Sequence, residues 1–519
     1  MSVGIARDRT RNPALRGAGA SARALAAEPA VLATAALTVI AAVLRFAYIG
    51  HQGYWFDEGN TALLMHYSPG EMLRQLARSE ETPPLYYCLA WIWTHVFGYG
   101  EAALRSLSAV FGVATVPVGY ALGRKLFSVR AGLIAAALVA CNPLLIWYSQ
   151  EARAYALLVL VTGLALLAFL YAREDPTPRR VAVWAAMAAV SLATHYYALL
   201  AIVPEALWLL VAHRRRRPVQ FAMAALALWG LALIPLALAQ KRTGRGNWIA
   251  GAPLSRRLGQ VPPQFLAGFQ LPAQSVLVPL AGGLALLGLA LLVWRGSERA
   301  RRGALWCAVL ALGGVVLNLL LIAGGIDDLL TRNLLGLWLP AALVVAGGLS
   351  VPRASIVGIL ATIGLCAIGV TSAIGVTANR DYQRPDWRGV ASLLGARPPL
   401  GGERAIFIQH YRDLLPMSLY MPGLAFERHA LRVRELDIVS FTSPPSGGFC
   451  WWGPACNLWP SVMQSSYAIP GFRTVSVRHI YQFTVMRLVA EVPTRLSPHE
   501  ISLALTTTRY RNDELLVQR

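Results

Sequence analysis

About eleven apolar runs, each near the length of a membrane-crossing helix, leave this chain few ways to fold. A helix that crosses a bilayer needs about 20 mostly apolar residues. The runs occupy residues 28–48, 104–123, 131–148, 154–172, 181–194, 197–212, 219–240, 273–294, 304–323, 332–350 and 355–375. Only 14% of the residues are charged, whereas soluble proteins carry roughly 25%. We therefore predict a polytopic α-helical membrane protein.

Positive charges gather in the short loops between these runs. The formal net charge is +21, a value that also occurs in nucleic-acid-binding proteins. The arginines and lysines, however, form clusters at 124–125, 179–180, 214–217 and 299–302. Basic clusters between apolar runs are typical of cytoplasmic loops of membrane proteins. We therefore expect no nucleic-acid partner, and a basic cytoplasmic tail over residues 1–27.

The order of the runs decides which loops lie outside once the N-terminus is placed in the cytoplasm. Run 28–48 then leads into a first outer loop, residues 49–103. Its apolar stretch 84–98 would extend about 22 Å as a helix, too short for about 30 Å of hydrocarbon, so we expect a juxtamembrane or re-entrant helix there. The loops predicted to be inside are then all basic, and among the loops between the runs the outer loop 241–272 is an exception because it also carries a group of basic residues. These features predict a protein of the cytoplasmic (inner) membrane, with a transmembrane domain over residues 28–375.

The composition changes after the last apolar run. Residues 376–519 carry only short apolar stretches, such as 405–409 and 480–488. This pattern predicts a small extracytoplasmic α/β or α+β domain. Cys450 and Cys456 lie in a loop of this domain, and outside the cytoplasm such a pair is able to form a disulfide.

Two adjacent carboxylates, Asp57 and Glu58, follow the first run directly. Acidic residues at the start of a helix complement its dipole, so a structural cap is one interpretation. The aromatic residues before them, with Tyr54 among them, are typical of a membrane interface. A carboxylate there can also accept a proton from an attacking hydroxyl, so we predict that both residues are catalytic.

Other polar and aromatic residues collect at the predicted outer ends of the helices. The candidates for a site are Tyr54, Arg78, Glu81, Tyr86, Tyr87, Arg105, Glu151, Arg153, Tyr155, His195, Tyr196 and Arg332. Each has a structural alternative, because arginines snorkel to the interface and a lone histidine is commonly a hydrogen-bonding group. In the functional interpretation, Glu151 is a second catalytic carboxylate near Asp57, arginines bind a phosphate, and the remaining side chains line a substrate pocket. The segment 381–388 is interpreted as a linker with Asp386 at or near a helix N-cap.

These motifs together resemble the GT-C glycosyltransferases. The resemblance lies in Phe56-Asp57-Glu58, Pro83 to Tyr87, Ser149 to Tyr155 and His195 to Tyr197, in that order along the chain. It is nearest to the bacterial relatives of protein O-mannosyltransferases and of aminoarabinose-to-lipid A transferases. It is strong over residues 28–212 and extends by topology to residue 375.

The resemblance implies an inverting hexosyl- or pentosyltransferase that takes its sugar from a polyprenyl-phosphate donor at the outer face of the membrane. Asp57 matches the acidic residue that the family places in its first outer loop, as base or acceptor-orienting group. Glu151 matches a second acidic residue in a later outer loop. The acceptor would be a hydroxyl of a glycan, a lipid or a protein.

The chain departs from the aminoarabinose transferases at Glu81-Thr82. At the corresponding position, the sequences of those enzymes read Glu-Lys-Pro, and the lysine reaches the donor phosphate. We expect Arg78, Arg105, Arg153 or Arg332 to make that contact instead. A divalent metal that bridges carboxylates and phosphate is compatible with this chemistry, although no ligand cluster demands one.

Two other functions remain open from the sequence. One is a membrane transporter or lipid flippase, and the other is a non-catalytic relative that binds lipid-linked glycans. Transporters place polar groups near the middle of the membrane. The polar residues of this chain collect at the ends of the apolar runs, which favours an enzyme.

Overall fold

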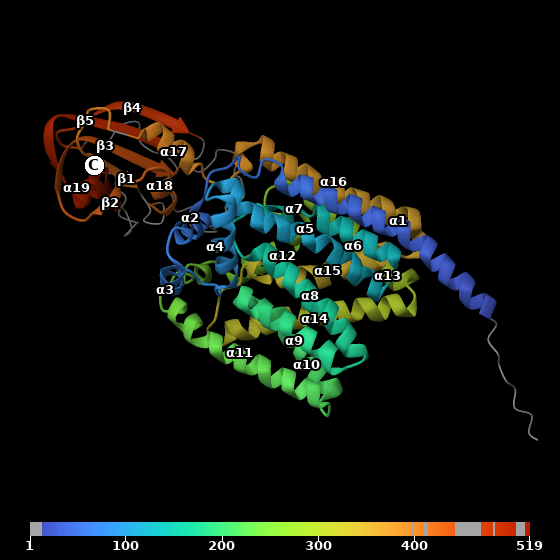
Figure 1. Ribbon diagram of the computed structural model, residues 1–519. Coiled ribbons are helices and arrows are strands. Elements are labelled where there is room, and N and C mark those ends of the chain that lie inside the picture. The colour runs from blue at the N-terminus through green and yellow to red at the C-terminus, as the bar shows by residue number, and fades with distance from the viewer. Residues whose placement is uncertain are drawn as a thin grey trace, which may run out of the picture.

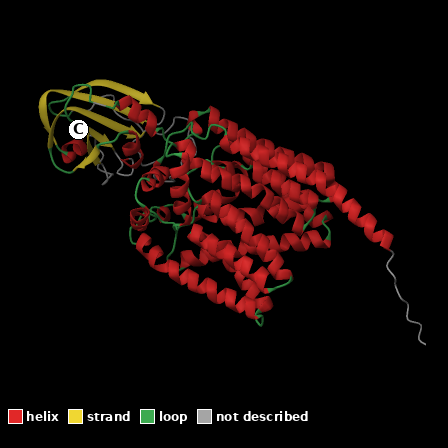
Figure 2. Ribbon diagram, viewed as in Figure 1, coloured by secondary structure: helices red, strands yellow, loops and turns green. Residues whose placement is uncertain are grey.

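The protein consists of a helical body with a sheet domain at one end (Figures 1 and 2). The computed structural model describes residues 13–396, 398–408, 414–441, 469–480, 483–504 and 514–518. The body contains α1 (Pro13–Phe46), α2 (Phe56–Met65), α3 (Pro69–Ser79), α4 (Leu85–Phe97), α5 (Glu101–Leu126), α6 (Val129–Cys141), α7 (Pro143–Ser149), α8 (Tyr155–Glu174), α9 (Pro178–Thr194), α10 (Leu199–His213), α11 (Arg217–Lys241), α12 (Leu254–Ala267), α13 (Gln274–Arg295), α14 (Glu298–Ala323), α15 (Trp338–Leu349) and α16 (Ser355–Ala378). Short 3-10 helices join some of them: η1 (Tyr196–Ala198), η2 (Ile249–Gly251), η3 (Thr331–Leu337), η4 (Pro352–Ala354) and η5 (Arg380–Tyr382).

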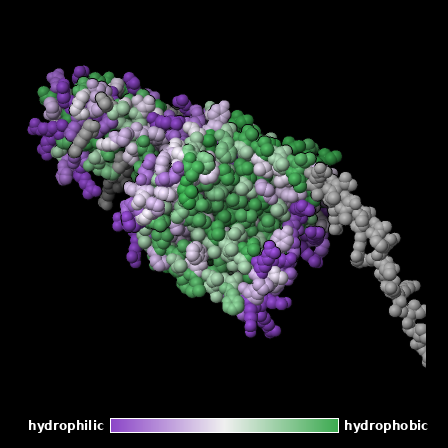
Figure 3. Space-filling model, viewed as in Figure 1, coloured by the Kyte–Doolittle hydropathy of each residue, from purple (hydrophilic) through white to green (hydrophobic). Residues whose placement is uncertain are grey.

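Within the described ranges, nine helices are long and apolar enough to cross a membrane, or ten if the bent pair α6–α7 is one span. Run 181–194 forms α9, whose 17 residues extend about 26 Å; α9 is not among the candidate spans, so the structure supports nine or ten of the eleven predicted ones. Figure 3 shows a broad hydrophobic surface over the body and hydrophilic surface toward its ends. The predicted multi-pass helical membrane fold is confirmed.

The first loop after α1 folds into three short helices at one end of the body, next to the sheet domain (Figure 1). Among them, α4 has 13 residues, about 20 Å, and packs on α2 and α5. It is not one of the candidate spans. The prediction that stretch 84–98 forms a short juxtamembrane helix therefore agrees with the structure.

The span that leads to Glu151 is broken near its end. Between α6 and α7 the chain bends by 55°. Asn142 caps α7 by accepting the N–H of Leu145, and the ring of Pro143 removes the next N–H donor. Arg45 of α1 is buried and donates to the carbonyls of Val139 and Ala140 at 2.8 Å each. A guanidinium thus satisfies the carbonyls at the end of α6, which stabilises the break.

The C-terminal domain is a six-stranded sheet with three helices. Its elements are α17 (Trp387–Leu394), β1 (Arg404–Ile408), α18 (Leu414–Tyr420), β2 (Leu424–Glu427), β3 (Leu431–Phe441), β4 (Arg473–Ile480), β5 (Phe483–Leu496), α19 (Pro498–Ala504) and β6 (Glu514–Gln518). The described strands follow the order β2-β6-β1-β3-β5-β4, and among their pairs only β1–β3 is parallel. Apolar clusters cover both faces of the central strands. This mixed sheet confirms the predicted small α/β or α+β domain, while Cys450 and Cys456 lie outside the described residues.

The sheet domain packs on the body through α18, which contacts α2. The contact is close because Gly59 of α2 has no side chain: a Cβ there would lie 3.0 Å from the backbone nitrogen of Pro416. The hydroxyl of Tyr420 accepts the N–H of Tyr54 at 2.6 Å and donates to Glu101 at 2.8 Å. The helix that carries Asp57 and Glu58 is therefore wedged between the body and the sheet domain.

Candidate active site

Helix α2 places Asp57 and Glu58 in its first turn. Trp55 occupies the N-cap position, and no side chain makes the capping hydrogen bond. The two carboxylates point to different surroundings, because Glu58 is fully buried whereas the side chain of Asp57 is 15% exposed. They therefore have different roles.

Glu58 is paired with Arg105 of α5. The guanidinium donates to Oε1 at 2.7 Å and to Oε2 at 2.6 Å, and Oε1 also accepts the N–H of Ala152 at 2.9 Å. Burial by itself raises the pKa of Glu58, but the charge and hydrogen bonds of Arg105 outweigh it, so the pKa is lowered. Glu58 is thus an ionised anchor between three segments.

Arg105 has no donor left for a substrate in this arrangement. Besides its bonds to Glu58, it donates to the carbonyls of Ile49, Gln52 and Gly53 at 3.0, 2.7 and 2.8 Å. A guanidinium carries five N–H groups, and all of them are used. The geometry favours a structural role for Arg105 over the phosphate contact that we expected.

Asp57 faces a pocket at the end of the body. Its Oδ2 accepts an N–H from Nη1 of Arg332 at 3.0 Å. The pocket, here called the acidic pocket, is lined by Phe56, Asp57, Asn60, Ser79, Glu80, Glu81, Arg153, Arg245, Trp248 and Arg332. Its empty space, counted together with the solvent at its open side, is about 520 Å³. Predicted site residues from four separate segments therefore meet here.

Glu80 and Arg153 form a buried pair on one wall of the acidic pocket. Nη1 of Arg153 donates to Oε1 of Glu80 at 2.5 Å, and the side-chain amide of Asn60 donates to the same oxygen at 2.5 Å. Nη1 also lies 3.4 Å from the carbonyl oxygen of Asp57. Arg153 is therefore held close to Asp57 without contacting its carboxylate.

A second pocket adjoins the acidic pocket, and the two share Trp248 and Arg332. This aromatic pocket is lined by Trp55, Tyr148, Trp248, Arg257, Gln260, Gln264, Phe269, Leu330, Thr331 and Arg332. Arg257 is buried and donates to both carboxylate oxygens of Asp327, at 2.6 and 2.7 Å. The loop 241–272 thus supplies arginines to both pockets, and Arg332 stands at the boundary between them.

Glu151 lies behind these pockets. It is 1% exposed, and its Oε2 accepts an N–H from Arg384 at 3.1 Å. Burial raises the pKa of Glu151 to about 7, with the charge of Arg384 acting in the opposite direction. Glu151 lines neither pocket, so direct contact with a substrate is not its evident role.

His195 is buried and accepts the N–H of Tyr197 through Nδ1 at 3.2 Å. Burial, with the positive charges of Arg153 and Arg332, lowers its pKa to about 3. The imidazole is therefore neutral at physiological pH. A proton-donating role does not suit it, and it acts as a cap for η1.

The tyrosines that we expected in the substrate pocket have structural partners. Tyr86 bonds to Ser108 at 2.9 Å, Tyr87 to Thr82 at 3.0 Å and Tyr196 to Gln240 at 2.8 Å. The hydroxyl of Tyr54 donates to the carbonyl of Tyr99 at 2.8 Å. Together with Tyr155 and His195, these side chains line neither the acidic nor the aromatic pocket. Glu81 does line the acidic pocket, whereas Arg78 is exposed and lines neither pocket.

Sequence reasoning missed several residues of the site: Asn60, Glu80, Arg245, Trp248 and Arg384. A signal existed for Glu80, which adjoins Glu81 in the double-proline motif. The basic residues of loop 241–272 were an anomaly of the charge pattern that pointed to Arg245. Nothing in its local sequence singles out Arg384.

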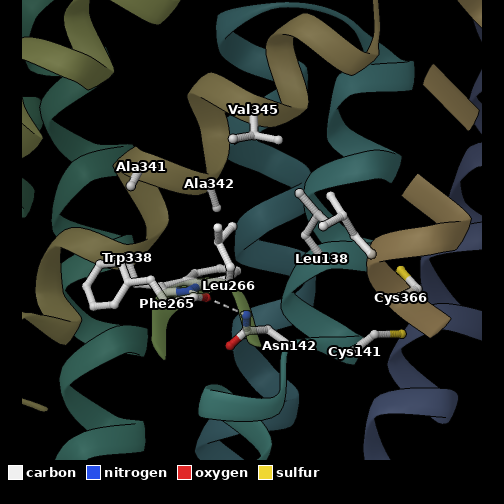
Figure 4. A pocket seen from close by; sticks show the side chains of 11 residues that line it. Leu138, Cys141, Asn142, Phe265, Leu266, Trp338, Ala341, Ala342, Val345 and Cys366 are labelled. Atoms are coloured by element: carbon white, nitrogen blue, oxygen red, sulfur yellow. Dashed lines mark hydrogen bonds between the residues drawn. The ribbon is translucent and has the colours of Figure 1, made fainter. Parts of the chain in front are cut away.

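An apolar cavity lies deeper in the body (Figure 4), lined by Leu138, Cys141, Asn142, Phe265, Leu266, Trp338, Ala341, Ala342, Val345, Leu365 and Cys366. The side chain of Asn142 donates to the carbonyl of Phe265 at 2.8 Å, and the indole of Trp338 donates to the same oxygen at 3.0 Å. The break before α7 is thereby tied to α12, the helix that separates this cavity from the aromatic pocket.

No group of three or more His, Cys, Asp or Glu side chains suited to a metal ion occurs among the residues described. Two of the three carboxylates that line the acidic pocket have arginine partners, in the pairs Asp57–Arg332 and Glu80–Arg153. Alternating positive and negative side chains of this kind suit a substrate that carries both a phosphate and hydroxyl groups.

Residues 81–239 match the model of the family described as dolichyl-phosphate-mannose-protein mannosyltransferase. The matched stretch contains Glu81, Glu151, Arg153 and His195. This match confirms, over residues 81–239, the resemblance to protein O-mannosyltransferases. No curated protein matches the chain.

Solved structures show weaker likenesses. ArnT from Cupriavidus metallidurans bound to undecaprenyl phosphate has 15% identity and a TM-score of 0.49, over 88% of this chain and 97% of that one. The apo form of the same protein has 19% identity and a TM-score of 0.42, over 71% and 70%. The archaeal oligosaccharyltransferase AglB from Archaeoglobus fulgidus, in complex with an inhibitory peptide and a dolichol-phosphate, has 13% identity and a TM-score of 0.44, over 75% and 63%. With these low scores, the case for a function comes from the family match and the pockets themselves.

Proposed function

We propose that this protein is an inverting glycosyltransferase that moves a hexose or pentose from a polyprenyl-phosphate donor to an acceptor hydroxyl. The observation that carries the proposal is the pairing of Asp57 with Arg332 in a pocket at the end of a membrane bundle. The family match supports a lipid-phosphate sugar as donor, because the family is described by dolichyl-phosphate-mannose.

Arg332 is the side chain best placed to bind the donor phosphate. It lines both pockets, and Arg245 lines the acidic pocket beside it. Phosphate oxygens compete with Asp57 for the Arg332 guanidinium, since both are anionic acceptors. When Arg332 turns to the phosphate, the Asp57 carboxylate becomes available as a base.

In the proposed reaction, the acceptor oxygen attacks the anomeric carbon from the side opposite the phosphate. The bond between this carbon and the phosphate oxygen breaks, and the acceptor's proton passes to Asp57. Negative charge grows on the departing phosphate, where arginines stabilise it. The products are an inverted glycoside and a polyprenyl phosphate.

We place the site on the outer face of the cytoplasmic membrane. Support comes from the charge pattern. The apolar spans separate the site residues from the basic loops that we predict to be cytoplasmic. We propose that the acceptor, which is a glycan, a lipid or a protein, enters through the aromatic pocket.

Transfer of radiolabelled sugar from polyprenyl-phosphate donors into membranes tests the proposal. Asp57→Asn keeps the shape of the side chain and its acceptor for Arg332 but removes the base, so we expect at least a 100-fold loss of transfer, in keeping with typical contributions of about 10²–10⁴. Asp175→Asn is the matched control, since Asp175 is an exposed partner of Arg180 far from the pockets. Full activity in folded Asp57→Asn protein contradicts the assignment.

A further inference from the structure

Arg384 enters the body from the linker to the sheet domain. It lies between η5 and α17, yet it is only 5% exposed. Its backbone N–H donates to the side-chain oxygen of Gln52 at 2.9 Å. Its guanidinium lies 4.2 Å above the ring of Trp147 and donates to the carbonyl of that residue at 3.3 Å. The linker therefore inserts a fixed positive charge beside α7.

The carboxylate of Glu151 is the anionic partner of this charge. Arg384 is the cation that forms an ion pair with Glu151 in the described part of the chain. The other oxygen, Oε1, is buried and has no hydrogen-bond partner among the described residues. A buried carboxylate with one cation depends strongly on that cation, since removing one member of a buried pair leaves an uncompensated charge.

Other charged groups near Glu151 do not replace Arg384. Asp57 and Glu58 of α2 are negatively charged neighbours of Glu151, and they disfavour a further negative charge on it. Arg332 acts from η3 but is paired with Asp57. The neighbouring phenols are Tyr86 of α4, Tyr148 of α7 and Tyr155 of α8.

The loop that Glu151 begins connects to both walls of the site. The N–H of Ala152 donates to Glu58 at 2.9 Å, and Arg153 reaches Glu80 in the acidic pocket. A contact that fixes the position of Glu151 therefore also fixes the loop 151–153, which places Arg153 beside Asp57.

The sheet domain keeps Arg384 in position. Four residues along the chain, Arg388 donates to the carbonyls of Gly50 and His51 and pairs with Glu101. Tyr420 of α18 bonds to the backbone of Tyr54 and to the same Glu101. The linker is thus fastened to the segment that leads into α2.

We infer that Arg384 is a positioning residue of the active site: its ion pair holds Glu151 and the loop 151–153 in place, and the sheet domain holds Arg384. The C-terminal domain is in this way a structural part of the site. The inference rests on the proposed function for its kinetic readout, but the Arg384–Glu151 pair can be tested separately.

The kinetic experiment compares full-length Arg384→Met, Arg384→Lys and wild type across pH. Loss of an adjacent positive charge disfavours the ionised carboxylate, typically by about 1–3 pH units. We expect Arg384→Met to lose at least tenfold in transfer at pH 7, with activity returning as pH rises, and Arg384→Lys to keep most of the wild-type profile. Arg380→Met is the matched control, because Arg380 is an exposed residue of the same linker.

Two further measurements separate the inference from the proposed function. Infrared titration of the carboxylic C=O band, assigned by its loss in Glu151→Gln, reports protonation of Glu151 without any substrate. We expect this band to persist to higher pH in Arg384→Met than in wild type. The double variant Arg384→Met/Glu151→Gln removes both charges and should lack this band at every pH.

Each result has a distinct meaning. A shifted band with no transfer by wild type on any donor supports the Arg384–Glu151 pair and contradicts the proposed function. Identical bands and identical pH profiles in Arg384→Met and Arg380→Met overturn the inference, even if Asp57→Asn is inactive. If Arg384→Met does not fold, a wild-type profile in the charge-free double variant overturns the inference, and loss of transfer in that folded variant supports it.

Discussion

Arg105 and Arg388 bind the same stretch of backbone, residues 49–53. Arg105, from within the body, donates hydrogen bonds to the carbonyls of Ile49, Gln52 and Gly53. Arg388, from the linker to the sheet domain, donates to the carbonyls of Gly50 and His51. Every carbonyl of the segment that delivers Asp57 and Glu58 is therefore bound by a guanidinium, so the start of α2 is fixed by side chains that are far apart in sequence.

The buried Glu58–Arg105 pair should be essential for folding. Arg105→Met leaves the Glu58 carboxylate buried without a cation and frees three carbonyls, so we expect a loss of about 3–5 kcal/mol in stability. Thermal unfolding in detergent measures the loss. Arg74→Met is the control, because its pair with Glu71 is surface-exposed and should cost at most about 1 kcal/mol. Equal melting temperatures for Arg105→Met and Arg74→Met would contradict the structural role of Arg105.

Arg332 should contribute mainly to use of the donor. Arg332→Gln keeps a hydrogen-bond donor to Asp57 but loses the positive charge that stabilises the departing phosphate. We expect kcat/KM for the lipid-linked donor to fall about 10²–10³-fold with little change in melting temperature. Arg302→Gln serves as control, since Arg302 is exposed and pairs with Glu298. If the only change is a higher KM for the acceptor, Arg332 binds the acceptor and not the donor.

His195 should make stability depend on acid without controlling catalysis. Its folded-state pKa is lowered to about 3, against about 6.5 for a free histidine. The unfolded chain therefore binds a proton that the folded protein does not, so stability is complete above about pH 6.5 and decreases as pH falls toward 3. His195→Asn keeps an acceptor for the N–H of Tyr197 and removes this titration.

Melting temperatures at pH 7 and pH 5 check this expectation. We expect a smaller acid-induced decrease for His195→Asn than for wild type, while His499→Asn, at an exposed position, should behave as wild type. An unchanged decrease in His195→Asn would show that other groups account for the acid sensitivity.

The helical spans were predictable because each is encoded by a local run of apolar residues. The short helix α4 followed from its length alone, and the N-cap of α17 followed from Asp386, which accepts the N–H of Gly389 at 2.9 Å. Sheet pairing was not predictable beyond the domain class, because register depends on contacts between distant strands.

The site was predictable in its location but not in its pairing. The outer-end pattern brought Asp57, Glu81, Arg153 and Arg332 to one pocket. Whether a carboxylate is a base or an anchor depends on its partner, and the partner of Asp57 is 275 residues away. The tyrosines of the double-proline motif have the composition of a substrate pocket, yet packing between α2, α4 and α5 buries them. Arg384 escaped notice because only the docking of the sheet domain brings it to Glu151.

The docking of the sheet domain has a consequence for the order in which the protein is made. Gln52 accepts a hydrogen bond from a residue 332 positions later, and Tyr54 donates one to a residue 366 positions later. Asp57 and Glu58 therefore leave the ribosome long before the residues that complete their surroundings. A nascent or truncated chain inserted in the membrane would carry the motifs of the candidate site without its geometry, so we expect the site to form only after the sheet domain has been synthesised.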